Sequence, residues 1–247
     1  MAPDELQGKT AVITGASSGI GEVTARALAA RGVNVALLAR RRDRVERLAE
    51  ELGGSVKAIA IEADVTDRDS MQAAAGQVAD ELGPVDILLN NAGQMLLAPF
   101  TPDHSEETRR MVETNLLGAM TTLEVFLDQL RDGGGDLVNI SSVAGRTAKP
   151  GSSVYNATKW GLNGWSEALR QELQGDDIRV IVIEPGAIAT ELTDHISHER
   201  SRQGAEKMYA DLAIPAEDVA DVIVFAVAQP ARTSLNEILI RPTKQAL

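Results

Sequence analysis

The chain has no cysteine, and aromatic residues make up only 3% of its 247 residues. The lack of cysteine excludes disulfides, thiol catalysis and metal sites built on thiolates. With so few aromatic rings, the core must consist mainly of Ala, Val, Leu and Ile, within a hydrophobic share of 44%. Such a composition suits parallel strands that lie between layers of helices.

Basic residues are also scarce, because 24 Lys and Arg face 36 Asp and Glu and leave a net charge of −12. This excess of negative charge argues against a nucleic-acid-binding surface. Residues 1–6 contain no basic stretch followed by an apolar one, so we expect no signal peptide. No apolar run reaches about 18 residues, so we expect no membrane contact and a cytoplasmic protein.

Short apolar runs alternate with helical patterns along the whole chain. The expected strands cover residues 10–14, 33–39, 56–61, 85–90, 136–140, 178–183 and 237–240. The expected helices cover residues 20–31, 44–52, 70–82, 106–130, 153–173 and 216–228. This alternation predicts an α/β fold, a Rossmann-type doubly wound parallel sheet of about seven strands with helices on both faces. We find no repeat or linker, so residues 1–247 are expected to form a single domain.

A glycine-rich turn joins the first strand to the first helix, with the spacing Gly-x-x-x-Gly-x-Gly over residues 15–21. Glycine lets a backbone turn tightly and approach a pyrophosphate, and the following helix N-terminus offers N–H groups to the anion. The alternative is a turn without a ligand, but the strand–turn–helix–strand context favours a dinucleotide site. The predicted contacts in this turn are Gly15, Ser17, Ser18, Gly19 and Ile20.

The end of the second strand indicates which dinucleotide is bound. Ala39 is followed by Arg40, Arg41 and Arg42, with no carboxylate before Asp43. An acidic residue here binds the ribose 2′-hydroxyl of NAD, whereas arginine pairs with a 2′-phosphate. We therefore predict NADP(H), held by Arg40 and with weaker support by Arg41; the alternative is a solvated basic start to the next helix.

Asp64 and Val65 follow the third strand and are further cofactor candidates. The Asp64 carboxylate can accept a hydrogen bond from an adenine amino group. It can equally cap a helix that begins near Thr66. The sequence leaves these two roles open.

Tyr155 and Lys159 stand four residues apart on a predicted helix, so their side chains share one face. An ammonium beside a phenol favours the phenolate, and we expect it to lower the Tyr155 pKa. The phenol would then be a proton donor usable near neutral pH. A lone Tyr-x-x-x-Lys is weak, because helices pair such residues by chance.

These features together resemble the short-chain dehydrogenase/reductase family over nearly the whole chain. Within it, residues 115–118, 91–97 and 236–243 resemble the branch that includes clavulanate dehydrogenase and bacterial serine or 3-hydroxy acid dehydrogenases. The matching pieces occur in the family's order: the 14–21 turn, Asp64, residues 90–93, Asn115, residues 140–142, Tyr155 with Lys159, and Pro185-Gly186.

The resemblance implies a catalytic set of Asn115, Ser142, Tyr155 and Lys159. Ser142 is preferred to Ser141 because it precedes the tyrosine by the family's usual 13 residues (155 − 142 = 13); we expect Ser141 to bond backbone at the strand end. Lys159 is expected to hold the nicotinamide ribose and Asn115 to anchor a water. Further cofactor contacts implied by the family are Asn91, Ala92, Gly93, Tyr155, Lys159, Pro185, Gly186, Ile188 and Thr190, and Thr190 could instead cap a helix.

The polar stretch 190–211 is the expected substrate lid. It would cover a site formed by Gln94, Met95, Ser142, Arg146 and Tyr155. Arg146 and the basic lid residues suggest a substrate carboxylate, with Arg146 as its first candidate partner. Because the lid also carries acidic residues, a solvated helix explains its charge equally well.

The predicted function is reversible hydride transfer between NADP(H) and a small-molecule carbonyl or alcohol, in a homotetramer. The alternatives are a sensor that binds NADP(H) without turnover and a methyltransferase-like domain for another adenosine cofactor. The full Asn115, Ser142, Tyr155 and Lys159 set argues against a sensor, and Arg40 argues against the methyltransferase. No metal site is expected, because the three histidines have no partners at metal-ligand spacing.

Overall fold

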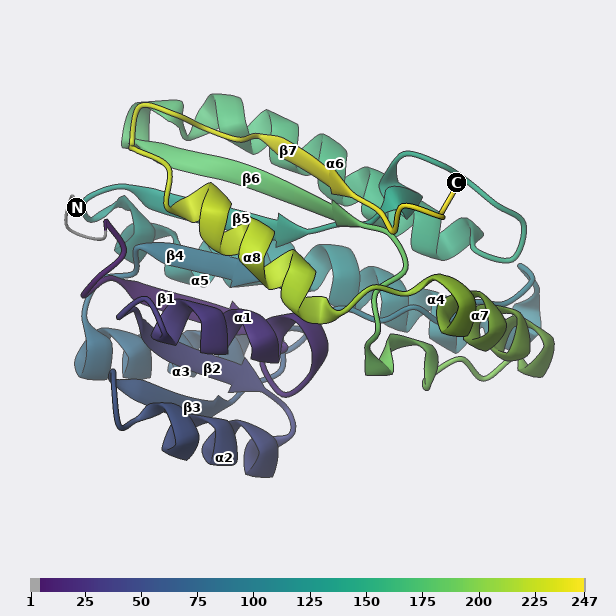
Figure 1. The fold of residues 1–247 in the computed structure, drawn as a ribbon, viewed down its shortest axis with the longest axis horizontal. Helices are drawn as coiled ribbons and strands as arrows, with labels where there is room; N and C mark the ends of the chain where they lie inside the picture. The colour runs from purple at the N-terminus through teal and green to yellow at the C-terminus, as the bar shows by residue number, and fades with distance from the viewer. Residues whose placement is uncertain (1–4, 247) are drawn as a thin grey trace.

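The computed structural model describes residues 5–246, so the ends of the predicted 1–247 domain lie outside the described residues. In this part of the chain, parallel strands form a seven-stranded sheet in the order β3-β2-β1-β4-β5-β6-β7 (Figure 1). The predicted doubly wound α/β fold is confirmed. The strands are β1 (Thr10–Thr14), β2 (Asn34–Ala39), β3 (Ala58–Glu62), β4 (Ile87–Asn90), β5 (Gly135–Ile140), β6 (Ile178–Pro185) and β7 (Glu237–Ile240).

Helices cover both faces of the sheet. One face carries α1 (Gly19–Ala29), α2 (Arg42–Leu52) and α8 (Ala216–Val227), whose buried side chains share one core cluster. The other face carries α3 (Arg68–Leu82), α5 (Gly118–Arg131) and α6 (Ser153–Glu172). The remaining helices, α4 (Ser105–Val112) and α7 (Glu199–Leu212), lie beyond the carboxyl ends of the strands, at the right of Figure 1.

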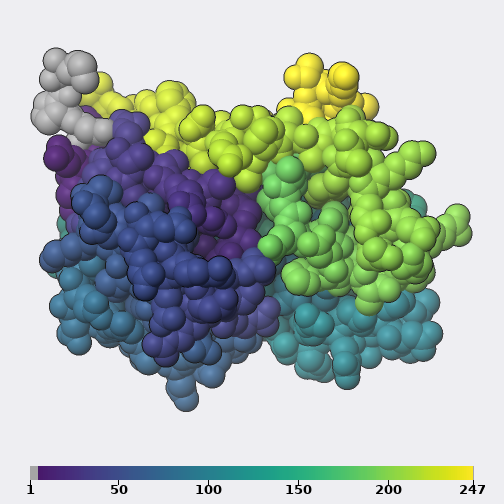
Figure 2. All heavy atoms as spheres, turned by 60° about the horizontal axis from the view of Figure 1, so that its bottom comes forward, coloured from purple at the N-terminus to yellow at the C-terminus, as the bar shows by residue number. Residues whose placement is uncertain are grey.

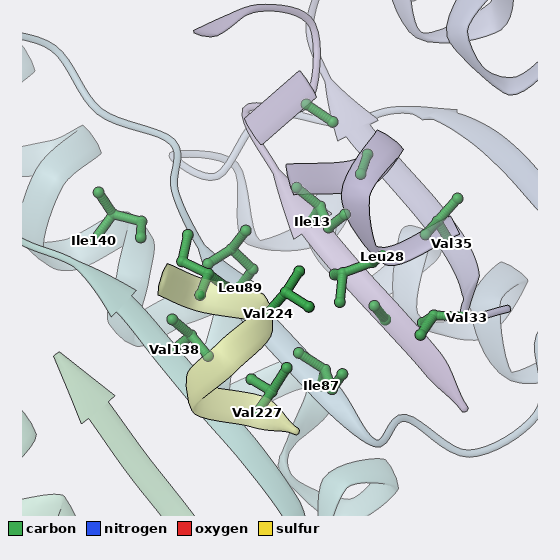
Figure 3. Packing of buried hydrophobic residues seen from close by; sticks show 14 of the residues in the cluster. Ile13, Leu28, Val33, Val35, Ile87, Leu89, Val138, Ile140, Val224 and Val227 are labelled. Atoms are coloured by element: carbon green, nitrogen blue, oxygen red, sulfur yellow. The ribbon is translucent and has the colours of Figure 1, made fainter. Parts of the chain in front are cut away.

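The strands are buried on both faces, which explains why their sequences are continuous apolar runs. Ile13, Leu89 and Val138 point toward α1 and α8, where Val224 packs against them (Figure 3). Leu88 and Leu137 belong to the opposite cluster, together with Phe126 of α5. Aliphatic side chains fill both layers, as the scarcity of aromatic residues predicts.

The predicted helix 106–130 contains an irregular turn that its sequence pattern does not indicate. Between α4 and α5 the chain forms a π-helical turn, η2 (Glu113–Leu117), with Asn115 at its centre. Such turns are rare and occur frequently at functional sites. Gly118 follows this turn and packs against the loop that precedes α3. A Cβ atom on Gly118 would lie 2.7 Å from Val65 Cγ2.

The order of the strands places a crevice at one edge of the sheet. The chain leaves β1 toward β2 and β3, and then returns to place β4 on the other side of β1. Ligands of open α/β sheets bind where the strand order reverses, beyond the carboxyl ends of the strands. No helix within residues 5–246 is long and apolar enough to cross a membrane.

Replacement of Phe126 by alanine tests the core. The side chain is fully buried (0% exposed), so Phe126→Ala should lower the free energy of unfolding by about 3–5 kcal/mol. Urea unfolding followed by circular dichroism measures this change. Phe100→Ala is the matched control, because Phe100 is 77% exposed and its loss should change stability by less than about 0.5 kcal/mol. Equal losses in both variants would contradict the packing described here.

Candidate active site

A cleft of about 300 Å³ opens at the carboxyl ends of the strands. It lies between the N-terminal half and the segment 190–211, which face each other in Figure 2 as purple-blue and green atoms. Every predicted cofactor residue lines it: Gly15, Ser17, Ser18, Gly19, Ile20, Arg40, Arg41, Asp64, Val65, Asn91, Ala92, Gly93, Tyr155, Lys159, Pro185, Gly186, Ile188 and Thr190. The cleft has the size of a small-molecule site.

The glycine-rich turn packs directly against the loop that follows β4. Gly15 has φ +66°, and a Cβ on it would lie 2.9 Å from Ala92 Cα. A Cβ on Gly21 would lie 2.5 Å from Asn91 Nδ2. Both positions therefore require glycine, and the N-terminus of α1 faces the cleft through Ser18 and Ile20.

The end of β4 is fixed to its neighbours by side-chain hydrogen bonds. Asn91 Nδ2 donates to the Thr14 carbonyl oxygen at 2.9 Å, and the Asn91 backbone N–H donates to Thr14 Oγ1 at 3.0 Å. Asn90 Nδ2 donates to Asn139 Oδ1 on β5 at 2.9 Å. These bonds hold the β1, β4 and β5 ends at one level, so the residues that follow them line one cleft.

The two arginines after β2 take different positions. Arg41 turns back over the glycine-rich turn, where its guanidinium donates to Ser17 Oγ at 3.0 Å and to Ser18 Oγ at 2.6 Å. Arg40 stands at the mouth of the cleft with 65% of its side chain exposed, and its Nη1 lies 4.0 Å from Asp64 Oδ2. The Arg40 guanidinium is thus accessible, whereas Arg41 is engaged by the protein.

Glu191, which sequence reasoning did not select, bridges the two sides of the cleft. It lies in η5 (Glu191–Thr193), and its carboxylate accepts from Arg41 Nη1 and from Arg44 Nη1, both at 2.7 Å. Hydrogen bonds from Arg41 and then Arg44 lower the Glu191 pKa to about 2. The bridge ties the segment 190–211 to the β2–α2 connection.

Asp64 does not cap α3, so that alternative is wrong. Its Oδ1 accepts from the backbone N–H of Thr66 at 2.9 Å and from Thr66 Oγ1 at 2.8 Å, which closes a local turn. The cap of α3 is Asp67, which accepts from the N–H groups of Asp69 and Ser70. Thr190 does cap η5, accepting from the N–H of Leu192, while also lining the cleft.

Tyr155, Lys159 and Ser142 meet in the buried floor of the cleft. Burial raises the Tyr155 pKa, and a hydrogen bond with Ser142 lowers it by a smaller amount. The Lys159 Nζ atom lies 5.8 Å from the centre of the Tyr155 ring and donates to the Ile140 carbonyl oxygen at 2.8 Å. The expected lowering of the Tyr155 pKa by Lys159 is therefore wrong for this structure; instead, burial lowers the Lys159 pKa to about 8.

The structure places Asn115 behind the cleft rather than on its surface. Its Oδ1 accepts from the Gln94 N–H at 2.7 Å, and its Nδ2 donates to the Gln94 carbonyl oxygen at 2.8 Å and to Thr158 Oγ1 at 3.2 Å. A Cβ on Gly93 would lie 3.4 Å from Asn115 Oδ1 and 3.9 Å from Lys159 Nζ, so these two side chains are neighbours. Asn115 thus joins η2, the strand-like segment after β4, and α6.

The two serines after β5 point in different directions. Ser142 Oγ accepts from the Ala144 N–H at 3.1 Å and lines the cleft beside Tyr155. Ser141 Oγ donates to Asn163 Oδ1 on α6 at 2.5 Å. The expectation was a hydrogen bond to backbone, whereas the structure shows one to a side chain. Only Ser142 shares a hydrogen bond with the phenol.

Comparison with known proteins identifies the family. A family model described as short chain dehydrogenase matches residues 9–201. An uncharacterized oxidoreductase of Staphylococcus saprophyticus is 37% identical over 247 residues, covering 99% of this chain and 100% of that protein. This chain belongs to the short-chain dehydrogenase family. Serine 3-dehydrogenase of Agrobacterium fabrum is 36% identical, covering 96% of this chain and 95% of that protein.

Solved structures of this family have the same fold. An alcohol dehydrogenase from the archaeon Thermococcus sibiricus, complexed with 5-hydroxy-NADP, matches with a TM-score of 0.87 and 30% identity over 97% of this chain and 98% of that chain. The closed form of a serine dehydrogenase complexed with NADP+ matches with a TM-score of 0.89 and 30% identity over 96% of both chains. The predicted resemblance to the short-chain dehydrogenase/reductase family and its serine dehydrogenase branch is confirmed.

Two residues predicted for the substrate side of this dehydrogenase lie outside the cleft. Met95 is buried beneath it, with its sulfur 4.0 Å from the Tyr209 hydroxyl. Arg146 pairs with the fully buried Glu184 (Nε to Oε2, 2.6 Å) and with Glu237 of β7. The Arg146 guanidinium is therefore bound by the protein itself, and the prediction that it receives a substrate carboxylate is contradicted. Gln94, in contrast, does line the cleft.

Three charged residues of the segment 190–211 pair with one another. Arg202 binds Glu199 and Glu206 along α7, both at 2.6 Å. His198 caps the same helix by accepting from the Ser201 N–H. These contacts match a solvated helix, the alternative that the sequence had left open. Among residues 5–246, no group of three or more His, Asp or Glu could hold a metal ion.

Several lining residues escaped sequence reasoning. Arg110 and Thr114 lie one helical turn apart just before Asn115, so helical spacing around that asparagine would have found them. Tyr209 of α7 lies over the site, and burial raises its pKa, with a smaller rise from Tyr155. His195 and Leu192 complete this end of the cleft.

The lowered Lys159 pKa makes stability depend on pH. Unfolded lysine titrates near 10.5, so between about pH 8 and 10.5 the unfolded chain binds the proton that folded Lys159 has lost, and stability must rise with pH. The gain should be roughly 3 kcal/mol across this window, relative to Lys159→Met. Urea unfolding of ligand-free protein at several pH values measures it. Lys57→Met, at an exposed lysine, should keep the wild-type slope; parallel curves for wild type and Lys159→Met would refute the assignment.

Proposed function

We propose that this protein is an NADP(H)-dependent oxidoreductase that interconverts a carbonyl group and an alcohol by hydride transfer, with Tyr155 as general acid and base. The observation that carries the proposal is that Tyr155, Ser142 and Lys159 lie in the same cleft as the glycine-rich turn and Arg40. The bound cofactor would supply or accept the hydride. The protein supplies position and proton transfer.

Each residue of the catalytic set has a defined task in carbonyl reduction. Tyr155 donates its hydroxyl proton to the carbonyl oxygen as negative charge develops there, and Ser142 donates a hydrogen bond to the same oxygen. The pKa of a phenol already lies far above neutral and burial raises that of Tyr155 further, so its hydroxyl carries the proton at neutral pH. Lys159, buried beside it, holds the ribose of the cofactor, and Asn115 keeps Gln94 and α6 in register beneath both.

The chemistry of the residues fits NADP(H). No carboxylate stands at the tip of β2, where NAD-specific sites place one, and Arg40 is exposed at the cleft mouth. The related solved structures hold NADP+ and 5-hydroxy-NADP, which supports the same assignment. Arg40 pairs with the 2′-phosphate, and Arg41 adds its charge from the turn.

Cofactor preference tests the role of Arg40. Arg40→Gln should lower kcat/KM for NADPH by about 10- to 100-fold, because a charge-assisted hydrogen bond to phosphate is lost. The value for NADH should change by less than about threefold, since NADH lacks this phosphate. Arg42→Gln is the matched control, because Arg42 does not line the cleft and pairs with Glu46 on the exposed side of α2. Equal losses with both cofactors would remove the proposed 2′-phosphate site.

Turnover distinguishes this enzyme from a sensor that binds NADP(H) without chemistry. A panel of ketones, aldehydes and alcohols, assayed with NADPH and NADH at the reduced-nicotinamide absorbance band, should yield turnover. Tyr155→Phe should reduce it by about 100- to 10,000-fold through loss of proton transfer, while NADPH affinity stays within about threefold. Tight binding by wild type with no turnover across the panel would favour the sensor.

The remaining parts of the proposal concern assembly and access. The chain acts as one domain in which residues 190–211 form the substrate lid, in a homotetramer. Support for the tetramer comes from large apolar side chains that are exposed on α6, α8 and β7, namely Trp160, Phe225 and Leu239. The cytoplasmic location stays a prediction from sequence.

A further inference from the structure

We propose that Arg110 binds a carboxylate of the substrate, so that this enzyme acts on keto or hydroxy acids rather than on neutral carbonyl compounds. The inference rests on the proposed function and narrows its substrate class. It assigns to Arg110, on α4, the task that sequence reasoning gave to Arg146. The argument comes from the distribution of charge within the cleft.

The two ends of the cleft differ in their charged residues. Its lining carboxylates, Asp64 and Glu191, both lie at the end where Arg40 and Arg41 stand. The other Lys, Arg, Asp or Glu residues that line the cleft are Arg110 and Lys159, and Lys159 lies buried beside Tyr155. Leu192 and Tyr209 pack in the same cluster as Tyr155, and the cleft lining of this part includes no carboxylate.

The partner of Arg110 is neutral. Its Nη2 atom donates to Gln94 Oε1 at 2.9 Å, and it forms no ion pair with a carboxylate of residues 5–246. The adjacent Arg109 differs, because it is not among the residues that line the cleft and its Nη1 lies 3.9 Å from Glu113 Oε1. In a chain with twelve more acidic than basic residues (36 − 24 = 12), a cleft arginine without an acidic partner is available to an anionic ligand.

The contact that Arg110 makes holds it in a fixed place relative to the catalytic residues. Gln94 is buried, and its Nε2 donates to Thr114 Oγ1 at 3.0 Å. The side chain of Asn115 forms hydrogen bonds with the backbone N–H and the carbonyl oxygen of Gln94. The Arg110 guanidinium is thereby connected to the same residues that position Gly93 and α6. Most of its five N–H donors remain for a ligand, in a planar fork that matches the two oxygens of a carboxylate.

The geometry gives the substrate two anchors. Ser142 and Tyr155 receive the carbonyl oxygen on the floor of the cleft, and Arg110 receives the carboxylate from the α4 side. Leu192 and Tyr209 cover the carbon atoms between them. A neutral ketone has only the first anchor, so it should bind more weakly and in more than one orientation.

Paired substrates test the inference in the full-length enzyme with NADPH. We compare 2-, 3- and 4-keto acids with their methyl esters, in wild type, Arg110→Gln, Arg110→Lys and the control Arg109→Gln. Wild type should prefer one of the acids over its ester. Arg110→Gln should lower kcat/KM for that acid by about 10- to 100-fold and change the ester by less than about threefold, because only the acid loses a charge-assisted pair. Arg110→Lys should recover part of the acid activity, and Arg109→Gln should match wild type.

Two results would overturn the inference: a wild type that favours the esters or shows no preference, or an Arg110→Gln variant that loses acid and ester activity equally. Equal loss would mean that Arg110 only supports Gln94. A binding measurement separates failure here from failure of the proposed function. Calorimetric titration of malonate into the protein with NADP+ should give binding that Arg110→Gln weakens at least tenfold, with dimethyl malonate as the neutral control.

Arg110-dependent malonate binding without turnover of any carbonyl would refute the enzymatic function and retain the anion site. Turnover of carbonyl compounds together with malonate binding that is insensitive to Arg110→Gln would retain the function and refute the site.

Discussion

The side-chain amide of Asn115 is the contact on which the geometry of the site depends. With one oxygen and one nitrogen it holds the backbone of Gln94 at 2.7 and 2.8 Å and reaches Thr158 on α6. Asn115 lies in the π-helical turn Glu113–Leu117, and from this turn its side chain contacts two other segments of the chain. The loop that contains Gln94, the turn η2 and the helix α6 are thereby held together.

Burial, more than charge pairing, governs the ionisable groups of this floor. Tyr155 and Lys159 are both nearly inaccessible, and desolvation disfavours the charged form of each. The phenol therefore holds its proton and the ammonium gives its proton up more readily than in water.

The sequence was a good guide to whatever is periodic or local. Continuous apolar strands, glycine punctuation and the Tyr155–Lys159 spacing predicted the parallel sheet and a cleft whose cofactor residues all came together. It was a poor guide to pairings between distant side chains. Arg146 finds Glu184 and Glu237 only because β5, β6 and β7 are neighbours, and Glu191 finds Arg44 across 147 residues. Nor does the apolar pattern of residues 106–130 indicate the π-helical turn, because helix precedes and follows it without a break.

Glu191 and Tyr209 belong to one continuous segment, in which Glu191 binds the arginines that follow β2 and Tyr209 packs in the same cluster as Tyr155. The carboxylate of Glu191 thus fastens this segment to the β2–α2 connection. A single stretch of chain therefore contributes walls both to the part of the cleft beside Arg41 and to the part beside Tyr155.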